Sequence, residues 1–259
     1  MSCLLETDFM KLKRELQLTL GGKTKIIRFG EAETEKELNK IFKLRFDSYS
    51  GKGYIDPTCF PNGLETDDYD TKKDCRYFLA ELDGKAVSTI RIIFDEILPT
   101  EKYFSFNEPD EIKTIPRKNR AELGRFIVIP PDREKGIFLP RNIVMLFIFD
   151  LVVDFGINNG ILGGYSFVKD NLYKKLQKMR APIHPIIPYK QHYPNDGVIR
   201  GYFNQPENPV IPCYFVTSEF KKFIDRMFKN SWIFRKKDET KFILKKNLYT
   251  KFLKVMKII

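Results

Sequence analysis

Residues 76–94 read RYFLAELDGKAVSTIRIIF and carry the strongest structural signal in the chain. Two strand-like runs, 76–82 and 85–94, flank Asp83-Gly84, a two-residue turn whose backbone twist suits a β-hairpin. The period of two places Arg91 among apolar neighbours on one face of the second run. Because a buried arginine is costly unless it is paired, the hairpin predicts a sheet with a charged cluster beside it.

An acidic stretch just before this hairpin offers partners for Arg91. The candidates are Glu65, Asp67, Asp68 and Asp70 in that stretch, and Glu122 in the next predicted strand. A structural ion pair is one interpretation of this group. The other is that the pair shapes an amine-binding pocket, because carboxylates can hold an ammonium group or accept its proton through water.

The next predicted strand, 120–129, carries Glu122 and Arg125 three positions apart. Regular alternation would send their side chains to opposite faces, whereas a bulge at Gly124 would bring both to one side. A bulge also frees a backbone N–H group. That group could bind a thioester carbonyl oxygen and the negative charge that develops on it.

A basic loop follows this strand and leads into a long predicted helix that Pro140 opens. Arg133, Lys135 and Arg141 lie in the loop and at the start of the helix. A helix N-terminus with basic neighbours suits a phosphate group. We therefore expect these three residues to meet the phosphate of a pantetheine arm, although the loop has no second glycine at the expected place.

The remaining pattern predicts alternating helices and strands. Helices are expected over 9–20, 34–49, 140–155, 171–179 (capped by Asp170) and 220–228, with a further one marked by Leu244, Leu248, Phe252 and Val255; additional strands are expected over 25–29, 161–168, 197–203 and 210–216. This order favours an α/β fold in which a central mixed sheet has helices on both faces.

The charge of the chain is concentrated near its end. Residues 221–257 hold 13 Lys or Arg against 3 Asp or Glu, which is +10 of the formal net charge of +11. We expect one domain over residues 1–216, and a basic amphipathic helical extension over residues 217–259 packed on it. The extension suits an acidic protein, an anionic membrane surface or nucleic acid, or it is simply a solvated helical face.

Composition excludes several classes of site. The four cysteines form no C-x-x-C pair and only two histidines are present, so neither a zinc site nor a disulfide framework is expected, and the chain is interpreted as cytosolic. No signal peptide, dinucleotide fingerprint or serine elbow is visible. A nucleophile made of Cys213 with His184 or His192 has no support in the local sequence. The apolar run 143–157 contains two aspartates and predicts a buried helix rather than a membrane span.

Ordered blocks of sequence resemble the N-acyl amino acid synthases, relatives of the acyl-homoserine lactone synthases within the GNAT fold. The blocks are Arg45-Phe46-x-x-Tyr49, Gly53-Tyr54-Ile55-Asp56-Pro57, Phe60 to Asp70, Ser88-Thr89-Ile90-Arg91 and Glu122 to Val128. The resemblance covers roughly residues 38–179. It implies a GNAT-like acyltransferase that moves a long-chain acyl group from a thioester carrier to the amine of an amino acid, often tyrosine, by direct attack.

The resemblance also implies roles for particular residues. Arg45, Asp67, Asp70, Arg91, Glu122 and Arg125 fall where the wider family keeps its charged active-site cluster. On this basis Glu122 or Glu65 removes the proton through water, and Arg91 and Arg125 hold the cluster in place. We expect Arg45, Asp67, Asp70, Tyr54 and Phe126 to contact or position the substrates.

The resemblance finally implies partners. The donor is an acyl carrier protein thioester or acyl-CoA, and no tightly bound cofactor, metal or nucleic acid is expected. The basic extension would dock an acidic carrier protein, contact a membrane surface, or form a lid over an acyl tunnel. Tyr54 stands where a tryptophan is common in the lactone synthases, which favours the amino acid synthases. The alternatives are a lactone-type signal synthase that uses S-adenosylmethionine, and a non-catalytic module that binds acidic protein or membrane.

Overall fold

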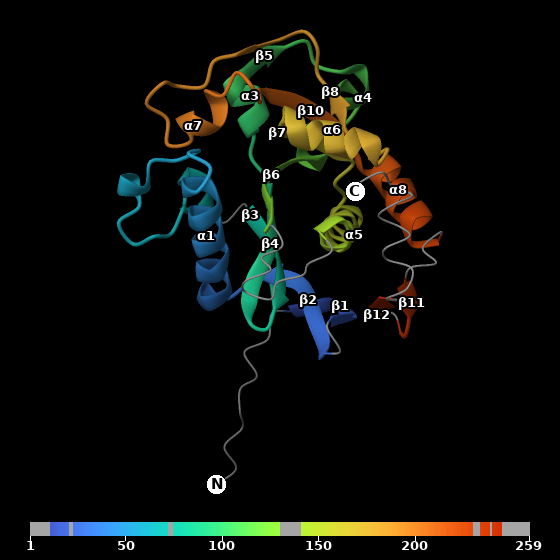
Figure 1. Ribbon diagram of the computed structural model, residues 1–259. Helices are drawn as coiled ribbons and strands as arrows, with labels where there is room; N and C mark the ends of the chain where they lie inside the picture. Colours follow the sequence, from blue (N-terminus) through green and yellow to red (C-terminus); the bar gives the residue numbers. More distant parts are fainter. Residues whose placement is uncertain are drawn as a thin grey trace.

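The computed structural model describes residues 11–20, 23–71, 75–129, 141–229, 234–238 and 240–244. Within these residues one large mixed sheet organises the molecule (Figure 1). Its strands follow the order β11 (Phe234–Lys236), β12 (Lys241–Leu244), β1 (Lys11–Leu20), β2 (Lys23–Ala32), β3 (Cys75–Leu82), β4 (Lys85–Ile93), β6 (Arg120–Val128), β7 (Gly163–Lys169), β10 (Val210–Val216) and β8 (His184–Pro185). A mixed α/β fold is therefore confirmed.

Helices cover both faces of this sheet (Figure 1). The helices are α1 (Glu35–Ser50), α2 (Asp68–Thr71), α3 (Pro99–Tyr103), α4 (Asp110–Lys113), α5 (Arg141–Asn158), α6 (Asp170–Lys178), α7 (Arg200–Phe203) and α8 (Thr217–Lys229), with short 3-10 turns at Pro57–Cys59 and Arg117–Asn119. Helix α1 lies on one face, and α5 lies on the other with α8 beside it. A separate pair of strands, β5 (Phe104–Phe106) and β9 (Tyr189–Gln191), lies above.

The sequence explains how the two main helices pack. Helix α1 begins with a capping box, in which Thr34 and Glu37 each accept a hydrogen bond from the other's backbone N–H group. Helix α5 is apolar almost all round, so it is buried between the sheet and α8. Its Asp150 accepts a hydrogen bond from Arg14 Nε of β1 at 2.8 Å. No helix in the described ranges has both the length and the apolar character needed to cross a membrane.

The central strands β6 and β7 are paired over a short distance only. Their parallel register runs from Arg120 opposite Gly163 to Glu122 opposite Tyr165. Beyond this point β6 continues to Val128 and β7 to Lys169 without pairing to each other. The two strands therefore open a cleft in the middle of the sheet.

The short paired part depends on close backbone contact at Gly164. A Cβ atom added there would lie 1.8 Å from the backbone oxygen of Ala121. We expect Gly164→Ala to push β7 away from β6 and to lower the free energy of unfolding by at least about 1–3 kcal/mol. Urea unfolding of the variant checks this expectation, with Gly84→Asn in the exposed hairpin turn as control. An unchanged midpoint for Gly164→Ala would contradict it.

Several expected elements differ from the structure. Residues 11–20 form strand β1 rather than a helix, and residues 200–203 form helix α7 rather than part of a strand. Asp170 is the first residue of α6 and pairs with Lys174 instead of capping the helix. The expected helical extension contains α8, but residues 234–244 supply two strands that extend the sheet. Its remaining expected helix, beyond Leu244, lies outside the described residues, and the domain division at residue 216 stays a prediction.

Candidate active site

A buried cluster of three arginines and three carboxylates lies against β4 and β6. Arg45 of α1 donates to both carboxylate oxygens of Asp70, at 3.0 and 2.8 Å, and its Nε donates to Glu65. The side chains of Arg45 and Glu65 are completely buried. Tyr77 donates a further hydrogen bond to Asp70 at 2.9 Å. Hence Arg45 of α1 and Asp70 of the acidic loop (residues 65–70) have hydrogen-bond partners within the protein.

Arg91 and Arg125 join the same cluster from the sheet. Arg91 donates to both oxygens of Asp67, at 2.6 and 2.8 Å, and to Asp70 at 2.6 Å. Arg125 donates to Asp67 at 2.7 Å, and its Nη2 lies 2.9 Å from Glu65. The expectation that Arg91 is paired with the acidic loop is confirmed for Asp67 and Asp70.

These contacts keep Asp67 and Asp70 ionised. Burial alone would raise the pKa of Asp67, but the charges of Arg125 and Arg91 outweigh burial and hold that pKa well below its usual range. Burial opposes ionisation of Asp70 too, yet Arg45 and Arg91 lower its pKa. Asp67 thus brings a fixed negative charge to the site.

A bulge interrupts the ladder between β4 and β6 beside Arg91. Thr89 is opposite Ile127 and Arg91 is opposite Gly124, so β6 holds one residue more than β4 in this interval. Arg125, inside the interval, has a φ of 55°, a left-handed conformation that is costly for a residue other than glycine. A bulge was expected at Gly124, and the structure has it one residue further along.

Glu122 occupies a different environment from the other carboxylates. Its side chain is buried, and it accepts hydrogen bonds from the backbone N–H group of Thr100 at 2.7 Å and from the Thr100 hydroxyl at 3.0 Å. Burial raises the pKa of Glu122 to about 8, although these two bonds favour the charged form. Glu122 was one candidate partner of Arg91, but both of its oxygens instead accept hydrogen bonds from Thr100 of α3.

The cleft between β6 and β7 opens into a cavity of about 610 Å³. Asp67, Arg91, Glu122 and residues 124–128 line one side of it, and residues 166–169 of β7 line the other. Aromatic rings surround it further, from Tyr49, Tyr54, Tyr69, Tyr103, Phe167, Tyr193 and Tyr202. The cavity therefore joins an ionised carboxylate, a carboxyl group that titrates near neutral pH and the bulge.

The expected site residues separate into two groups. Tyr54, Asp67, Arg91, Glu122, Arg125, Phe126 and Arg141 line the cavity. Arg45, Glu65 and Asp70 are not among its lining residues and lie behind it, where they hold Asp67, Arg91 and Arg125 in place. Arg133 and Lys135 lie outside the described residues. Among the described residues no cluster of His, Cys, Asp and Glu could hold a metal ion.

Two residues of the site were missed from the sequence, Thr100, which bonds to Glu122, and Lys169, which lines the cavity. Thr100 has no local motif that marks it, since its contact with Glu122 joins positions 22 apart in the chain. Lys169 ends a strand and was not singled out, yet it is buried inside the cavity. The sequence signal was a lysine directly after the predicted strand 161–168, a position at which a charged side chain can be buried only if it is paired.

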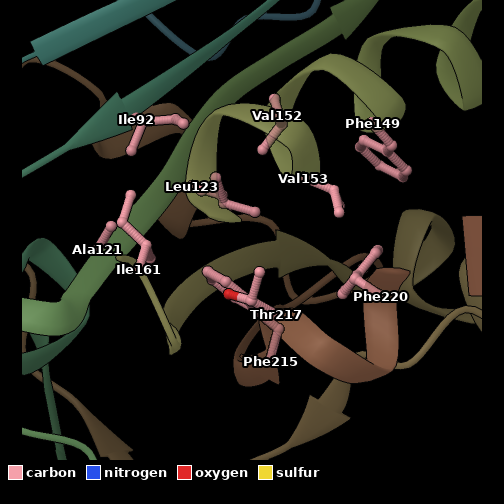
Figure 2. A pocket seen from close by; sticks show the side chains of 11 residues that line it. Ile92, Ala121, Leu123, Phe149, Val152, Val153, Ile161, Phe215, Thr217 and Phe220 are labelled. Atoms are coloured by element: carbon pink, nitrogen blue, oxygen red, sulfur yellow. The ribbon is translucent and has the colours of Figure 1, made fainter. Parts of the chain in front are cut away.

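A second, apolar cavity of about 20 Å³ lies behind the sheet. Figure 2 shows side chains of β4, β6, α5 and α8 converging on it, among them Ile92, Leu123, Val152 and Phe220. Leu123 lines both cavities, and it therefore separates the polar site from this apolar space.

Comparison with solved structures shows which class of protein has this fold. The chain is similar to the CoA-dependent acyl-homoserine lactone synthase MesI (20% identity, 79% of this chain and 96% of that chain, TM-score 0.54). It is also similar to the lactone synthase LasI (16%, 74% and 90%, 0.51) and to FeeM, an N-acyl amino acid synthase from uncultured soil microbes (12%, 79% and 97%, 0.50). These similarities show the GNAT-like fold of these synthases. No curated protein matches the chain.

A family of known sequences matches part of the chain. Residues 40–161 match the family of the N-acyl amino acid synthase FeeM, and this segment holds most of α1, the acidic loop, the bulge and α5. The match covers 122 of the 259 residues and relates this segment of the chain to the N-acyl amino acid synthases, a family of acyltransferases. The resemblance noted in the sequence is thereby confirmed.

Proposed function

We propose that the protein moves a long-chain acyl group from an acyl carrier protein or coenzyme A thioester to the amine of an amino acid such as tyrosine. The amine attacks the thioester directly and no acyl-enzyme forms. The observation that carries this proposal is the single cavity that joins Glu122, Asp67 and the β6 bulge. Two substrates can meet there, because the cavity is large and extends between β6 and β7.

Glu122 is the general base in this proposal. An acceptor amine enters as an ammonium group and must lose a proton before or as it attacks. A base is most effective when its pKa lies near the working pH, and the pKa of Glu122 is raised to about 8. Thr100 holds the carboxylate through two hydrogen bonds, and the proton reaches it through water. Glu65 is less suitable, because it is completely buried against Arg45 and does not line the cavity.

The bulge supplies the second part of the mechanism. When nitrogen attacks, the carbonyl oxygen of the thioester becomes an oxyanion, and the thiolate then leaves as the amide forms. Arg125 and Phe126 lie outside the paired register of β6 with β4, so their N–H groups are the ones available to that oxygen. Arg91 and Arg125 position Asp67, whose fixed negative charge favours entry of the acceptor ammonium.

The acyl tail and the carrier protein are expected to bind at two further places, the apolar part of the cavity and a basic surface on α8 and β11. We place the tail along the apolar part of the cavity toward Leu123, behind which lies the apolar space shown in Figure 2. Exposed basic residues on α8 and β11, namely Lys222, Arg226, Lys229, Arg235 and Lys236, suit an acidic carrier protein. The same surface suits an anionic membrane, which we propose only as a secondary contact.

The test is a screen of the purified full chain with long-chain acyl carrier protein and acyl-CoA donors against the standard amino acids. Release of free thiol and mass spectrometry of the product are measured. We expect a donor-dependent N-acyl amino acid, formed much more slowly by Glu122→Gln. Methylthioadenosine release with S-adenosylmethionine would instead support the lactone synthase. Thiol release that needs no amino acid would contradict the proposal. So would the absence of thiol release with every donor tested.

A further inference from the structure

Besides Arg91 and Arg125, which pair with the acidic loop, four cations line the cavity, and they differ in burial. Arg141 and Lys52 are exposed, Lys175 is half-buried, and Lys169 is 5% exposed. Among the described residues none of the four forms an ion pair with a carboxylate. Burial is the main cause that lowers the pKa of both Lys52 and Lys175, and the charge of Arg141 lowers each further. The three charges therefore act on one another. The mouth of the cavity is therefore cationic.

Lys169 is the most buried of the four, and it shares the ring of Tyr54 with Lys52, whose Nζ lies 5.6 Å from the ring centroid. The Nζ of Lys169 donates one hydrogen bond, at 2.8 Å, to the backbone oxygen of Asn208. Its ammonium lies over the rings of Tyr54 and Tyr202, at 5.4 and 4.9 Å from their centroids. Burial lowers the pKa of Lys169 to about 8. An ammonium group has three N–H donors, so this arrangement leaves donors that can meet an anion in the cavity.

The position of Lys169 says which anion this is. Arg141 and Lys175 belong to α5 and α6, on one side of the opened sheet. Tyr54 and Tyr202 instead belong to the aromatic cluster around α1 and α7, which also contains Tyr49 and Phe203. Exposed clustered cations suit the dense charge of a phosphate. A single buried lysine between aromatic rings suits one carboxylate on an organic acceptor.

We propose that Lys169 binds the carboxylate of the acceptor amino acid and thereby selects amino acids over simple amines. This inference rests on the proposed function and assigns a positioning and specificity residue to it. The carboxylate forms an ion pair with Nζ beside Tyr54 and Tyr202, and the amine is left free to react. A charged hydrogen bond of this kind is worth about 10- to 100-fold in affinity.

The experiment compares the wild type with Lys169→Met and Lys169→Arg. Each is given the amino acid that turns over fastest and the amine that lacks only its carboxylate, which for tyrosine is tyramine. For Lys169→Met we expect kcat/KM for the amino acid to fall about 10- to 100-fold, with kcat/KM for the amine and KM for the donor unchanged. Lys169→Arg should keep much of the preference. Turnover of the amine shows that the variant is folded.

Two results would overturn the inference. One is an unchanged preference for the amino acid in Lys169→Met. The other is a rise in KM for the donor instead, which would assign Lys169 to the phosphate; Lys175→Met is the comparison for that effect. Titration calorimetry measures the affinity of wild type and Lys169→Met for the amino acid in the absence of donor, so it tests the binding site without turnover. A wild type that binds the amino acid through Lys169 but never acylates it would reject the proposed function alone.

Discussion

Replacing Glu122 with glutamine is expected to lower kcat/KM by about 10²–10⁴-fold, the usual contribution of a positioned general base. Glutamine has the same shape, and it can accept from the Thr100 N–H group and donate to the Thr100 hydroxyl in place of the carboxylate bonds. Initial rates of thiol release, measured with saturating donor and varied amino acid, check the effect. Loss of less than about tenfold would mean that another group removes the proton.

The same variant has a signature in stability that does not depend on turnover. The pKa of Glu122 is about 8 in the folded protein and about 4.3 in an unfolded chain, so the folded protein keeps a proton that the unfolded chain has lost. Stability from this group is fully present below pH 4.3 and falls as the pH rises through 8. Glu122→Gln should therefore melt close to wild type at pH 5 and above it at pH 9. A lower melting temperature at both values would indicate disturbed packing.

Replacing Arg45 with methionine is expected to lower the free energy of unfolding by about 3–5 kcal/mol. The substitution leaves the carboxylates of Glu65 and Asp70 buried beside one another without their main partner. Urea unfolding followed by circular dichroism measures the loss.

Lys43→Met is the matched control for this prediction. Lys43 lies on the same helix and forms an exposed pair with Asp47 at 2.6 Å, four residues along. Such exposed pairs contribute only about 0.3–0.5 kcal/mol. If Arg45→Met and Lys43→Met had equal effects, the buried cluster would not be a source of stability.

Local signals were sufficient for part of the fold. The Asp83-Gly84 turn predicted the hairpin of β3 and β4, and the helix expected over 34–49 is α1. The segment 11–20 was misassigned because the spacing of Leu12, Leu16 and Leu20 is four residues. Four is both about one helical turn and twice the period of a strand. Leu18, which is 1% exposed in β1, fits only the alternation of a strand.

The candidate site shows a similar division. The pairing of Arg91 with the acidic loop could be predicted because a buried guanidinium requires carboxylates, and the loop precedes its strand. The pairing of Glu122 with Thr100 could not, because it depends on how α3 returns to the sheet. Lys169 meets Tyr54 and Tyr202 from distant parts of the chain, and only the assembled fold brings these groups together.

The strand β12 lies parallel to β1 and is hydrogen-bonded to it, with Leu16 opposite Phe242. Residues from opposite ends of the sequence thus meet within one layer. During synthesis the outer side of β1 has no neighbour until residue 244 has left the ribosome, and closing so long a loop is slow. A nascent chain held just short of that length would present β1 as an open edge on which other chains can pair.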